Sequence, residues 1–200
     1  MGELSPVSPS ERKAETRKRN LIIVAAAVPL AALFAVLGWA LSSTGGTPGG
    51  LGVNTSFGEV SIAEEQAQDF VTATLTGEPV SLAALEGKVV LLDFWASWCQ
   101  PCRVEAPELA QVYREYQGRG VEFVGIAIWD HPTDVAGHIQ EFDLPYPNVL
   151  DGNGKIGISY GVAGIPEKFF IDAQGRVVRK FLGPIDADNL RDNLDRLLAP

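Results

Sequence analysis

The 200-residue chain is 46% hydrophobic and 20% charged, which is the composition of an ordinary globular domain. This balance excludes an intrinsically disordered chain, and 2 cysteines are too few for a disulfide-rich scaffold. Acidic residues outnumber basic ones, and the formal net charge is −9. We therefore expect no basic surface that binds nucleic acid.

The first apolar segment is Leu21–Leu41, which carries no charge and is long enough to cross a hydrocarbon core of roughly 30 Å as a helix. We predict a transmembrane anchor at 21–41, after a cytoplasmic tail at 1–20. Lys and Arg residues in that tail favour a cytoplasmic N-terminus, so the rest of the chain is expected outside the cytoplasm, held at the cell membrane by a single span. The alternative is a cleaved signal peptide, whose apolar region is shorter, roughly 7 to 15 residues.

Two further regions follow the predicted anchor. Gly, Ser and Thr dominate residues 42–58, which we interpret as a flexible linker that cannot bury a core. Residues 59–200 then form one domain, and their number is sufficient for a proper core.

Two apolar runs in this domain, Val89–Trp95 and Val121–Ile128, are typical of strands covered on both faces. Between them, apolar residues at helical spacing predict a helix that Pro107 should kink and that Gly118 and Gly120 should end. Because the connections are short, strand, helix and strand should form a right-handed parallel unit.

The other expected elements extend this unit to a mixed sheet. They are a hairpin and a turn of helix within 70–85, a helix at Thr133–Phe142, antiparallel strands at Lys168–Asp172 and Val177–Leu182, and an amphipathic helix at Asp186–Leu198. The predicted fold class is α/β, with a mixed central sheet flanked by helices, an N-terminal hairpin and one transmembrane helix.

Both cysteines lie in the segment Trp98-Cys99-Gln100-Pro101-Cys102, between the first apolar strand and the predicted helix. At this position a Cys-x-x-Cys pair acquires redox chemistry. A helix N-terminus favours a thiolate on the first sulfur, so we expect Cys99 to be the nucleophile. Cys102, one turn further along, should be shielded and should attack the mixed disulfide that Cys99 forms with a substrate.

A zinc site and a static disulfide are the two alternative uses of the cysteines. A zinc site usually needs four ligands, and the histidines, His131 and His138, lie far along the chain, where we expect a loop residue and a surface helix residue. A static disulfide would close too short a loop to constrain the unfolded chain much. Neither use explains the placement of the pair at the start of a helix.

Two acidic residues are candidates for handling protons at this site. Asp93 is a lone acid in an apolar strand, and burial should raise its pKa toward neutrality. A strand-end Asp that bonds a nearby backbone amide is the alternative. Glu105 lies three residues after Cys102, which brings it to the same side of the helix. Taken alone, it is more often a solvated partner of the helix dipole.

The segments Leu85–Cys102 and Tyr160–Asp172 resemble the thioredoxin superfamily, and within it the membrane-anchored thiol-disulfide oxidoreductases of the TlpA, ResA and CcmG (DsbE) type. The likeness covers roughly residues 68–198 and implies a thioredoxin fold with a redox disulfide, without a cofactor or metal. It also implies that Pro166 is cis beside the cysteines and that the backbone of Ile165 pairs with substrate. We place Trp98 and Glu167 with them at the substrate-binding surface.

The resemblance assigns roles to the acids as well. Glu105 matches an acid that the ResA and CcmG type carries at that position, and Glu167 after Pro166 resembles the Pro-Glu pair of CcmG. Asp93 resembles the buried Asp that assists proton transfer at the second cysteine of thioredoxin, whereas the TlpA type commonly has Asn. Lys168 replaces the Thr that is usual there.

The implied function is a tethered reductant of disulfides in extracytoplasmic proteins, most typically apocytochrome c, recharged by a membrane electron donor of the CcdA or DsbD type. An oxidant that donates disulfides uses the same motif and is the first alternative. A metal-handling or binding domain is the second, although copper-chaperone relatives would need Cys-x-x-x-Cys and a distant His. The acids favour the reductant because negative neighbours disfavour a thiolate, and Arg103 is the only cation near them in sequence.

Overall fold

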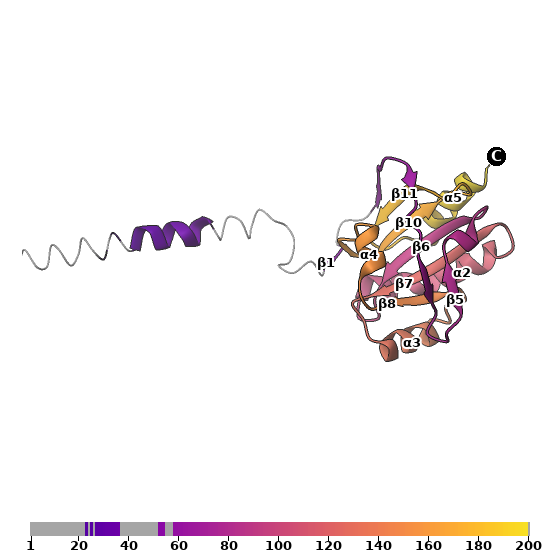
Figure 1. The fold of residues 1–200 in the computed structure, drawn as a ribbon, viewed down its shortest axis with the longest axis horizontal. Coiled ribbons are helices and arrows are strands. Elements are labelled where there is room, and N and C mark those ends of the chain that lie inside the picture. The colour runs from indigo at the N-terminus through magenta and orange to yellow at the C-terminus, as the bar shows by residue number, and fades with distance from the viewer. Residues whose placement is uncertain (1–22, 24, 26, 37–51, 55–57, 200) are drawn as a thin grey trace, which may run out of the picture. The chain divides into compact units, whose positions relative to one another are not determined.

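The computed structural model describes residues 23, 25, 27–36, 52–54 and 58–199 (Figure 1). Its two compact units are Met1–Thr47 and Pro48–Pro200. In the first unit, residues 27–36 are helical and exposed. Within the described ranges, no helix combines the length and the apolar character that a membrane span requires. The tail predicted at 1–20, parts of the anchor predicted at 21–41 and most of the linker predicted at 42–58 lie outside these ranges.

The second unit contains the strands and helices of the predicted domain. Its elements are β1 (Gly52–Val53), β2 (Gly58–Val60), β3 (Glu65–Gln66), β4 (Val71–Ala73), β5 (Pro79–Ser81), the 3₁₀ helix η1 (Ala83–Leu85), β6 (Val89–Trp95), α2 (Gln100–Tyr116), β7 (Val121–Ile128), α3 (Pro132–Glu141), β8 (Asn148–Asp151), α4 (Lys155–Ser159), β9 (Gly164–Ile165), β10 (Glu167–Ile171), β11 (Arg176–Leu182) and α5 (Ala187–Leu198).

The main sheet of this unit is mixed. Its strand order is β2-β11-β10-β6-β7-β8, and β3 also pairs with β11. Strands β6, β7 and β8 run parallel and are joined through α2 and α3, whereas β10 is antiparallel to both β6 and β11. The predicted α/β class with a mixed sheet and flanking helices is confirmed.

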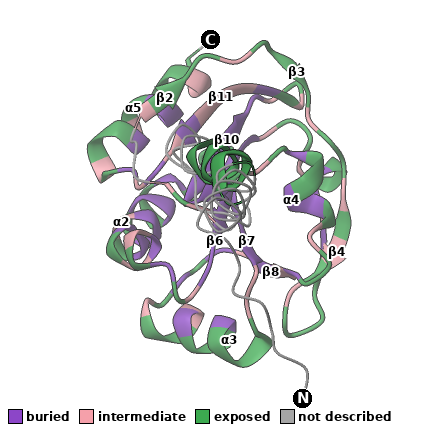
Figure 2. Cartoon of the chain, turned by 90° about the vertical axis from the view of Figure 1, so that its left-hand side faces the viewer, coloured by how far each residue is buried: buried purple, intermediate pink, exposed green. Residues whose placement is uncertain are grey.

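Alternate residues of the central strands pack into two separate cores. On β6, Leu91 belongs to a cluster that includes residues of α2 and α5, while Leu92 belongs to a second cluster that includes residues of α3 and α4. Both leucines are 0% exposed. Figure 2 shows the buried residues concentrated in the central strands, with the outer faces of the helices exposed. Burial on both faces explains why β6 and β7 are continuous apolar runs.

Several expected elements are present. Strands β4 and β5 form the predicted hairpin, and η1 follows it. Helix α2 contains Pro107 and continues to Tyr116, after which Gly118 takes a positive φ of 79°.

Other elements were missed by the sequence analysis: β1, β2, β3, β8, α4 and β9. Strand β1 pairs with β9 in parallel, through Gly52 and Val53. These two residues fall within the predicted linker, so the flexible-linker prediction does not hold for them. Segments of two to five residues carry no readable periodicity, and contacts with distant parts of the chain order them.

Candidate active site

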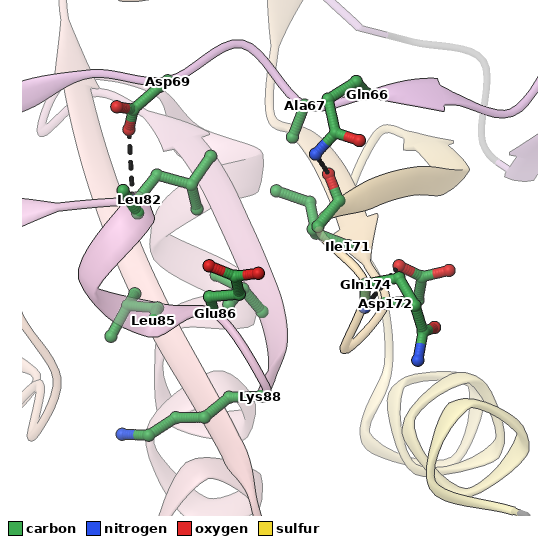
Figure 3. Close-up of a pocket in the computed structure, with 13 residues that line it drawn as sticks. Gln66, Ala67, Asp69, Leu82, Leu85, Glu86, Lys88, Ile171, Asp172 and Gln174 are labelled. Carbon is green, nitrogen blue, oxygen red and sulfur yellow. Dashed lines mark hydrogen bonds between the residues drawn. The ribbon is translucent and has the colours of Figure 1, made fainter.

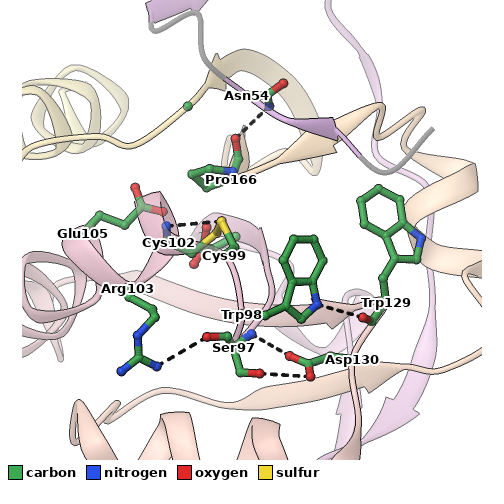
Figure 4. The surroundings of a disulfide bond; sticks show 12 residues. Asn54, Ser97, Trp98, Cys99, Cys102, Arg103, Glu105, Trp129, Asp130 and Pro166 are labelled. Carbon is green, nitrogen blue, oxygen red and sulfur yellow. Dashed lines mark hydrogen bonds between the residues drawn. A yellow bond between two sulfur atoms is a disulfide. The ribbon is translucent and has the colours of Figure 1, made fainter. Parts of the chain in front are cut away.

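Cys99 and Cys102 form a disulfide where β6 ends and α2 begins (Figure 4). Cys99 is the N-cap of α2, and its sulfur accepts a hydrogen bond from the Cys102 backbone N–H at 3.3 Å. Pro101 occupies the first turn, where its missing N–H is not needed. The free N–H groups of this turn favour a thiolate on Cys99 once the bridge opens. In the oxidised form both cysteines are buried, with Cys99 0% and Cys102 2% exposed.

The loop before α2 is held by residues that follow the neighbouring strand β7. The Asp130 carboxylate accepts hydrogen bonds from the Ser97 backbone N–H at 2.6 Å and from the Ser97 hydroxyl at 3.0 Å. The Trp98 indole N–H donates to the Trp129 carbonyl at 3.0 Å, although Trp98 is 47% exposed. Figure 4 shows both indoles on the same side of the disulfide. These bonds position Cys99 and leave an aromatic surface beside it.

A second loop reaches the disulfide from β9. The Ile165–Pro166 peptide bond is cis, and Pro166 lies next to the two cysteines (Figure 4). The Ile165 carbonyl accepts a hydrogen bond from the Asn54 backbone N–H at 2.7 Å. The Pro166 carbonyl accepts another from the Asn54 side-chain amide at 2.9 Å. The backbone edge beside the disulfide is therefore paired with a segment from within this chain.

Asp93, Glu105 and Lys168 form a buried ionic cluster, in which Glu105 lies on α2 about one turn after Cys102 (Figure 4). They are 3%, 2% and 0% exposed. Lys168 Nζ forms an ion pair with Glu105 and lies 3.4 Å from Asp93 Oδ1. Burial raises the pKa of Asp93 and the pKa of Glu105, while the Lys168 charge opposes both shifts. The predicted pair of acids is thus joined by a cation.

Glu167 and Arg103 do not join this cluster. Glu167 is 1% exposed, and Lys180 Nζ lies 2.5 Å from its carboxylate. Burial raises the pKa of Glu167, and the Lys180 charge opposes the shift. Successive residues of a strand point to opposite faces, so Glu167 and Lys168 lie on different sides of β10. Arg103 pairs instead with Glu141 at 2.5 Å. The cation beside the acids is therefore Lys168, and Glu167 is buried rather than exposed at the surface.

The disulfide, the cis-proline loop and every strand of the main sheet except β2 lie within the segment 62–198, which matches the Redoxin family model. The chain belongs to the Redoxin family. As the resemblance of its motifs implied, it is a thiol-disulfide oxidoreductase of the TlpA, ResA and CcmG type.

Relatives and solved structures of Redoxin-family proteins support this assignment. Thiol-disulfide oxidoreductase ResA of Bacillus cereus strain ZK / E33L is 33% identical over 133 residues, which are 66% of this chain and 77% of ResA. Thiol:disulfide interchange protein HelX of Rhodobacter capsulatus is 39% identical over 115 residues, which are 57% of this chain and 63% of HelX. A thioredoxin-family thiol:disulfide interchange protein from Chlorobium tepidum TLS superposes with a TM-score of 0.65 at 29% identity, covering 70% of this chain and 100% of that one. The thioredoxin-like fold is therefore confirmed.

Sequence reasoning missed several residues of this Redoxin-family site. Asp130 had a usable signal, because it follows β7 directly, and the carboxyl ends of parallel neighbours meet at one edge of a sheet. Lys168 was noted only as a departure from Thr, since nothing local shows that its side chain is buried. Asn54 had no signal at all in a Gly-rich and Thr-rich stretch.

His138 corrects an expectation. We predicted a surface helix residue, but His138 is 3% exposed and stacks on Trp95 with ring centroids 4.3 Å apart. Burial lowers the pKa of His138 to about 4. His131 is the exposed N-cap of α3. Across the described part of the chain, no group of three or more His, Cys, Asp or Glu side chains is arranged to hold a metal ion.

A pocket of about 260 Å³ lies at the opposite end of β6 from the disulfide (Figure 3). Its lining includes Lys88 and Val90 near the start of β6 and Asp172 after β10. Cys99 follows the far end of the seven-residue strand β6, on the order of 20 Å away. We therefore give this pocket no part in the disulfide chemistry.

Proposed function

We propose that this oxidoreductase is a membrane-tethered, extracytoplasmic reductant of protein disulfides, with apocytochrome c as its typical substrate. A membrane electron donor of the CcdA or DsbD type would return it to the dithiol form. The location rests on the uncharged run at 21–41 and the Lys and Arg residues that precede it. The chemistry rests on the disulfide at the start of α2 and on kinship with ResA and HelX.

The site supports a two-step reduction. The Cys99 thiolate attacks one sulfur of a substrate disulfide, which breaks that bond and releases the first substrate thiolate. Cys102 then loses its proton and attacks the Cys99 sulfur of the mixed disulfide, which releases the second substrate thiolate and restores the Cys99–Cys102 bridge. Two electrons pass from the protein dithiol to the substrate.

The charges around the sulfurs favour the reducing direction, and this observation carries the proposal. Two buried acids, Asp93 and Glu105, lie against one cation, Lys168, and Glu105 is on the helix that carries Cys102. Arg103, which follows Cys102, is drawn away to Glu141. A strong oxidant stabilises its reduced form through a very stable thiolate. This cluster supplies no net positive charge that would stabilise a thiolate, so the dithiol gives up its electrons more readily.

The surface beside Cys99 suits an extended protein segment. Trp98 offers an exposed aromatic face, and the Ile165–Pro166 backbone offers a strand edge to a substrate that displaces Asn54 from it. A hollow of about 530 Å³ opens at the same edge of the sheet, lined by Trp129, Asp130 and residues that follow β8. These features support a disulfide carried on an extended protein segment as the substrate.

The deciding experiment is the reduction potential of the Cys99/Cys102 pair, measured by equilibration with glutathione and dithiothreitol buffers. We expect a value closer to the roughly −270 mV of thioredoxin than to the roughly −120 mV of DsbA. A potential above about −150 mV would assign the protein to the disulfide-donating oxidants instead. The double variant Cys99→Ser/Cys102→Ser supplies the baseline without a transition.

Location needs a separate test. Protease added to intact spheroplasts should degrade the domain if it lies outside the cytoplasm. Protection of the domain would contradict the proposed location without touching the redox assignment.

A further inference from the structure

Lys168 is the least expected residue near the disulfide. It stands directly opposite Asp93 in the pairing of β10 with β6, so the two side chains share one face of the sheet. Its side chain is 0% exposed, and its ammonium group contacts Glu105 of α2 and lies 3.4 Å from the Gly183 carbonyl. One buried cation therefore bridges two acids from two different elements.

The charges of this cluster set how many protons it holds. With both carboxyls ionised, Asp93, Glu105 and Lys168 would carry a net negative charge in a dry environment, which is costly. With one carboxyl protonated, the cluster is neutral. Tyr146 also lies near the two acids, and burial and their charges raise its pKa, so its phenol is neutral. Cys102 precedes Glu105 by about one turn of α2. We expect one exchangeable proton in the oxidised protein.

The contacts decide which acid holds that proton. One carboxylate oxygen of Glu105 accepts a hydrogen bond from Lys168 Nζ. The other accepts a hydrogen bond from the Ile185 backbone N–H at 2.8 Å. Two donors favour the ionised form of Glu105. Asp93 Oδ1 is buried without a hydrogen-bond partner, with Lys168 Nζ 3.4 Å away. The proton therefore belongs to Asp93.

We infer that Lys168 is a positioning residue for proton transfer at Cys102, because it holds Glu105 as a carboxylate and leaves Asp93 as the proton carrier. When a thiolate attacks Cys99, the S–S bond breaks, and the leaving Cys102 sulfur takes the proton of Asp93 to become a thiol. In the reverse step the Asp93 carboxylate accepts that proton while Cys102 attacks the mixed disulfide and expels the partner thiolate. Lys168 and Asp93 play these parts in either direction of electron flow.

The test is the pH profile of the Cys102 step, followed as the second release of nitrothiobenzoate when the reduced full chain reacts with the aromatic disulfide DTNB. Lys168→Met removes the cation, so both carboxyls keep their protons to higher pH. We expect the midpoint of the profile to move up by at least about one pH unit and the rate at pH 7 to fall about tenfold. Lys168→Arg, which keeps the charge, should retain most of the rate.

Lys88→Met is the matched control, since Lys88 pairs with Glu122 at 3.1 Å near the other end of β6. A Lys168→Met profile that matches the wild type, or an equal shift in Lys88→Met, would overturn the inference. If Lys168→Met does not fold, Asp93→Asn keeps the cluster neutral, because it leaves Glu105 paired with Lys168. That variant should show a slow, pH-independent second release, and wild-type pH dependence in it would contradict the role of Asp93.

Residues 52–54 pair with the backbone beside the disulfide. Strand β1 is the strand paired with β9 in the described residues, and Asn54 adds hydrogen bonds to the Ile165 and Pro166 carbonyls. The fit is close: a Cβ on Gly164 would lie 2.6 Å from the Asn54 side-chain oxygen and 2.7 Å from the Gly52 carbonyl. Cys99, the expected nucleophile, is at the same time 0% exposed.

We propose that residues 52–54 act as an internal competitor for the substrate-binding edge. This rests on the assignment of that edge to an extended substrate peptide, because one strand edge can pair with one partner at a time. A tethered segment competes at a high effective concentration, so substrate must displace it. The occupant of this edge in the resting protein is the chain's own segment.

Graded variants of Asn54 test this in the full chain. Asn54→Ala removes the side-chain bond to Pro166, and Asn54→Pro also removes the backbone N–H that bonds Ile165. The readout is the rate at which iodoacetamide alkylates Cys99 in the reduced Cys102→Ser background. We expect this rate to rise about fivefold for Asn54→Ala and about tenfold or more for Asn54→Pro. KM for a disulfide-containing peptide should fall in the same order. An unchanged or slower alkylation rate in both Asn54 variants would overturn the competitor role. The reduction potential of the Cys99/Cys102 pair should stay unchanged in these variants, so this test does not depend on the reductant assignment.

Discussion

At the scale of single residues, Cys102 governs the fate of a captured substrate. Because Cys102 follows Cys99 by one helical turn and is buried, Cys102→Ser should leave Cys99 able to attack but leave the mixed disulfide unresolved. We expect mixed disulfides to accumulate in cells. They are measured on non-reducing gels after thiols are blocked, and the trapped partners identify the substrates.

The matched variant is Cys99→Ser, which should trap little. If Cys99→Ser accumulates partners and Cys102→Ser does not, the assignment of the nucleophile is wrong.

His138 makes stability depend on pH. Its pKa is about 4 in the folded protein, below the ordinary value of 6.5, because it is buried against Trp95. Between these values the unfolded chain binds a proton that the folded protein does not, so stability falls as pH drops from 6.5 to 4, by up to about 3 kcal/mol. His138→Phe should remove this part of the acid destabilisation, as measured by urea unfolding at pH 7 and pH 4.5. His131→Phe, at an exposed position, should keep the wild-type dependence, and an equal effect of both variants would contradict the argument.

At the scale of elements, substitutions of two glycines by alanine should change stability in opposite directions, one through packing and one through helix propensity. A Cβ on Gly125 of β7 would lie 1.9 Å from the buried Asn148 side chain and 2.9 Å from the Trp95 indole nitrogen. Gly125→Ala should therefore disturb the Trp95–Asn148 hydrogen bond and destabilise the domain by about 1–3 kcal/mol. Gly137 of α3 has no atom within 4 Å of the added Cβ, so Gly137→Ala should stabilise the helix by about 0.5–1 kcal/mol. Denaturant unfolding of the two variants measures both effects, and the same sign for both would refute this account.

At the scale of the whole molecule, the pairing of β1 with β9 should add to the stability of the second unit. The compact unit begins at Pro48, and β1 pairs with β9 near the disulfide. A chain that starts at Gly58 loses these hydrogen bonds and should unfold with about 1–2 kcal/mol less stability than one that starts at Pro48. Thermal unfolding should show this as a Tm lower by about 2–8 °C. Equal Tm values would mean that β1 adds nothing to the fold.

Local patterns were enough to predict much of the fold. The continuous apolar runs of β6 and β7 and the amphipathic spacing of α5 follow from which faces those segments bury, and such periodicity is visible within a dozen residues. The redox pair was also readable from the chain, because Cys99 and Cys102 lie where a strand gives way to a helix. Short polar strands such as β3 were missed because their order comes from a partner strand.

The sequence by itself therefore determined the class of the domain, the position of the disulfide and the motif around Pro166, since each depends on neighbours along the chain. Only the tertiary structure decided that Lys168 joins Asp93 and Glu105, because this depends on the register of β10 against β6 and on the packing of α2. The same holds for Asn54, whose partners lie 111 and 112 positions away in the chain. Contacts between distant segments are set by the burial of the whole core, and no local pattern of residues records them.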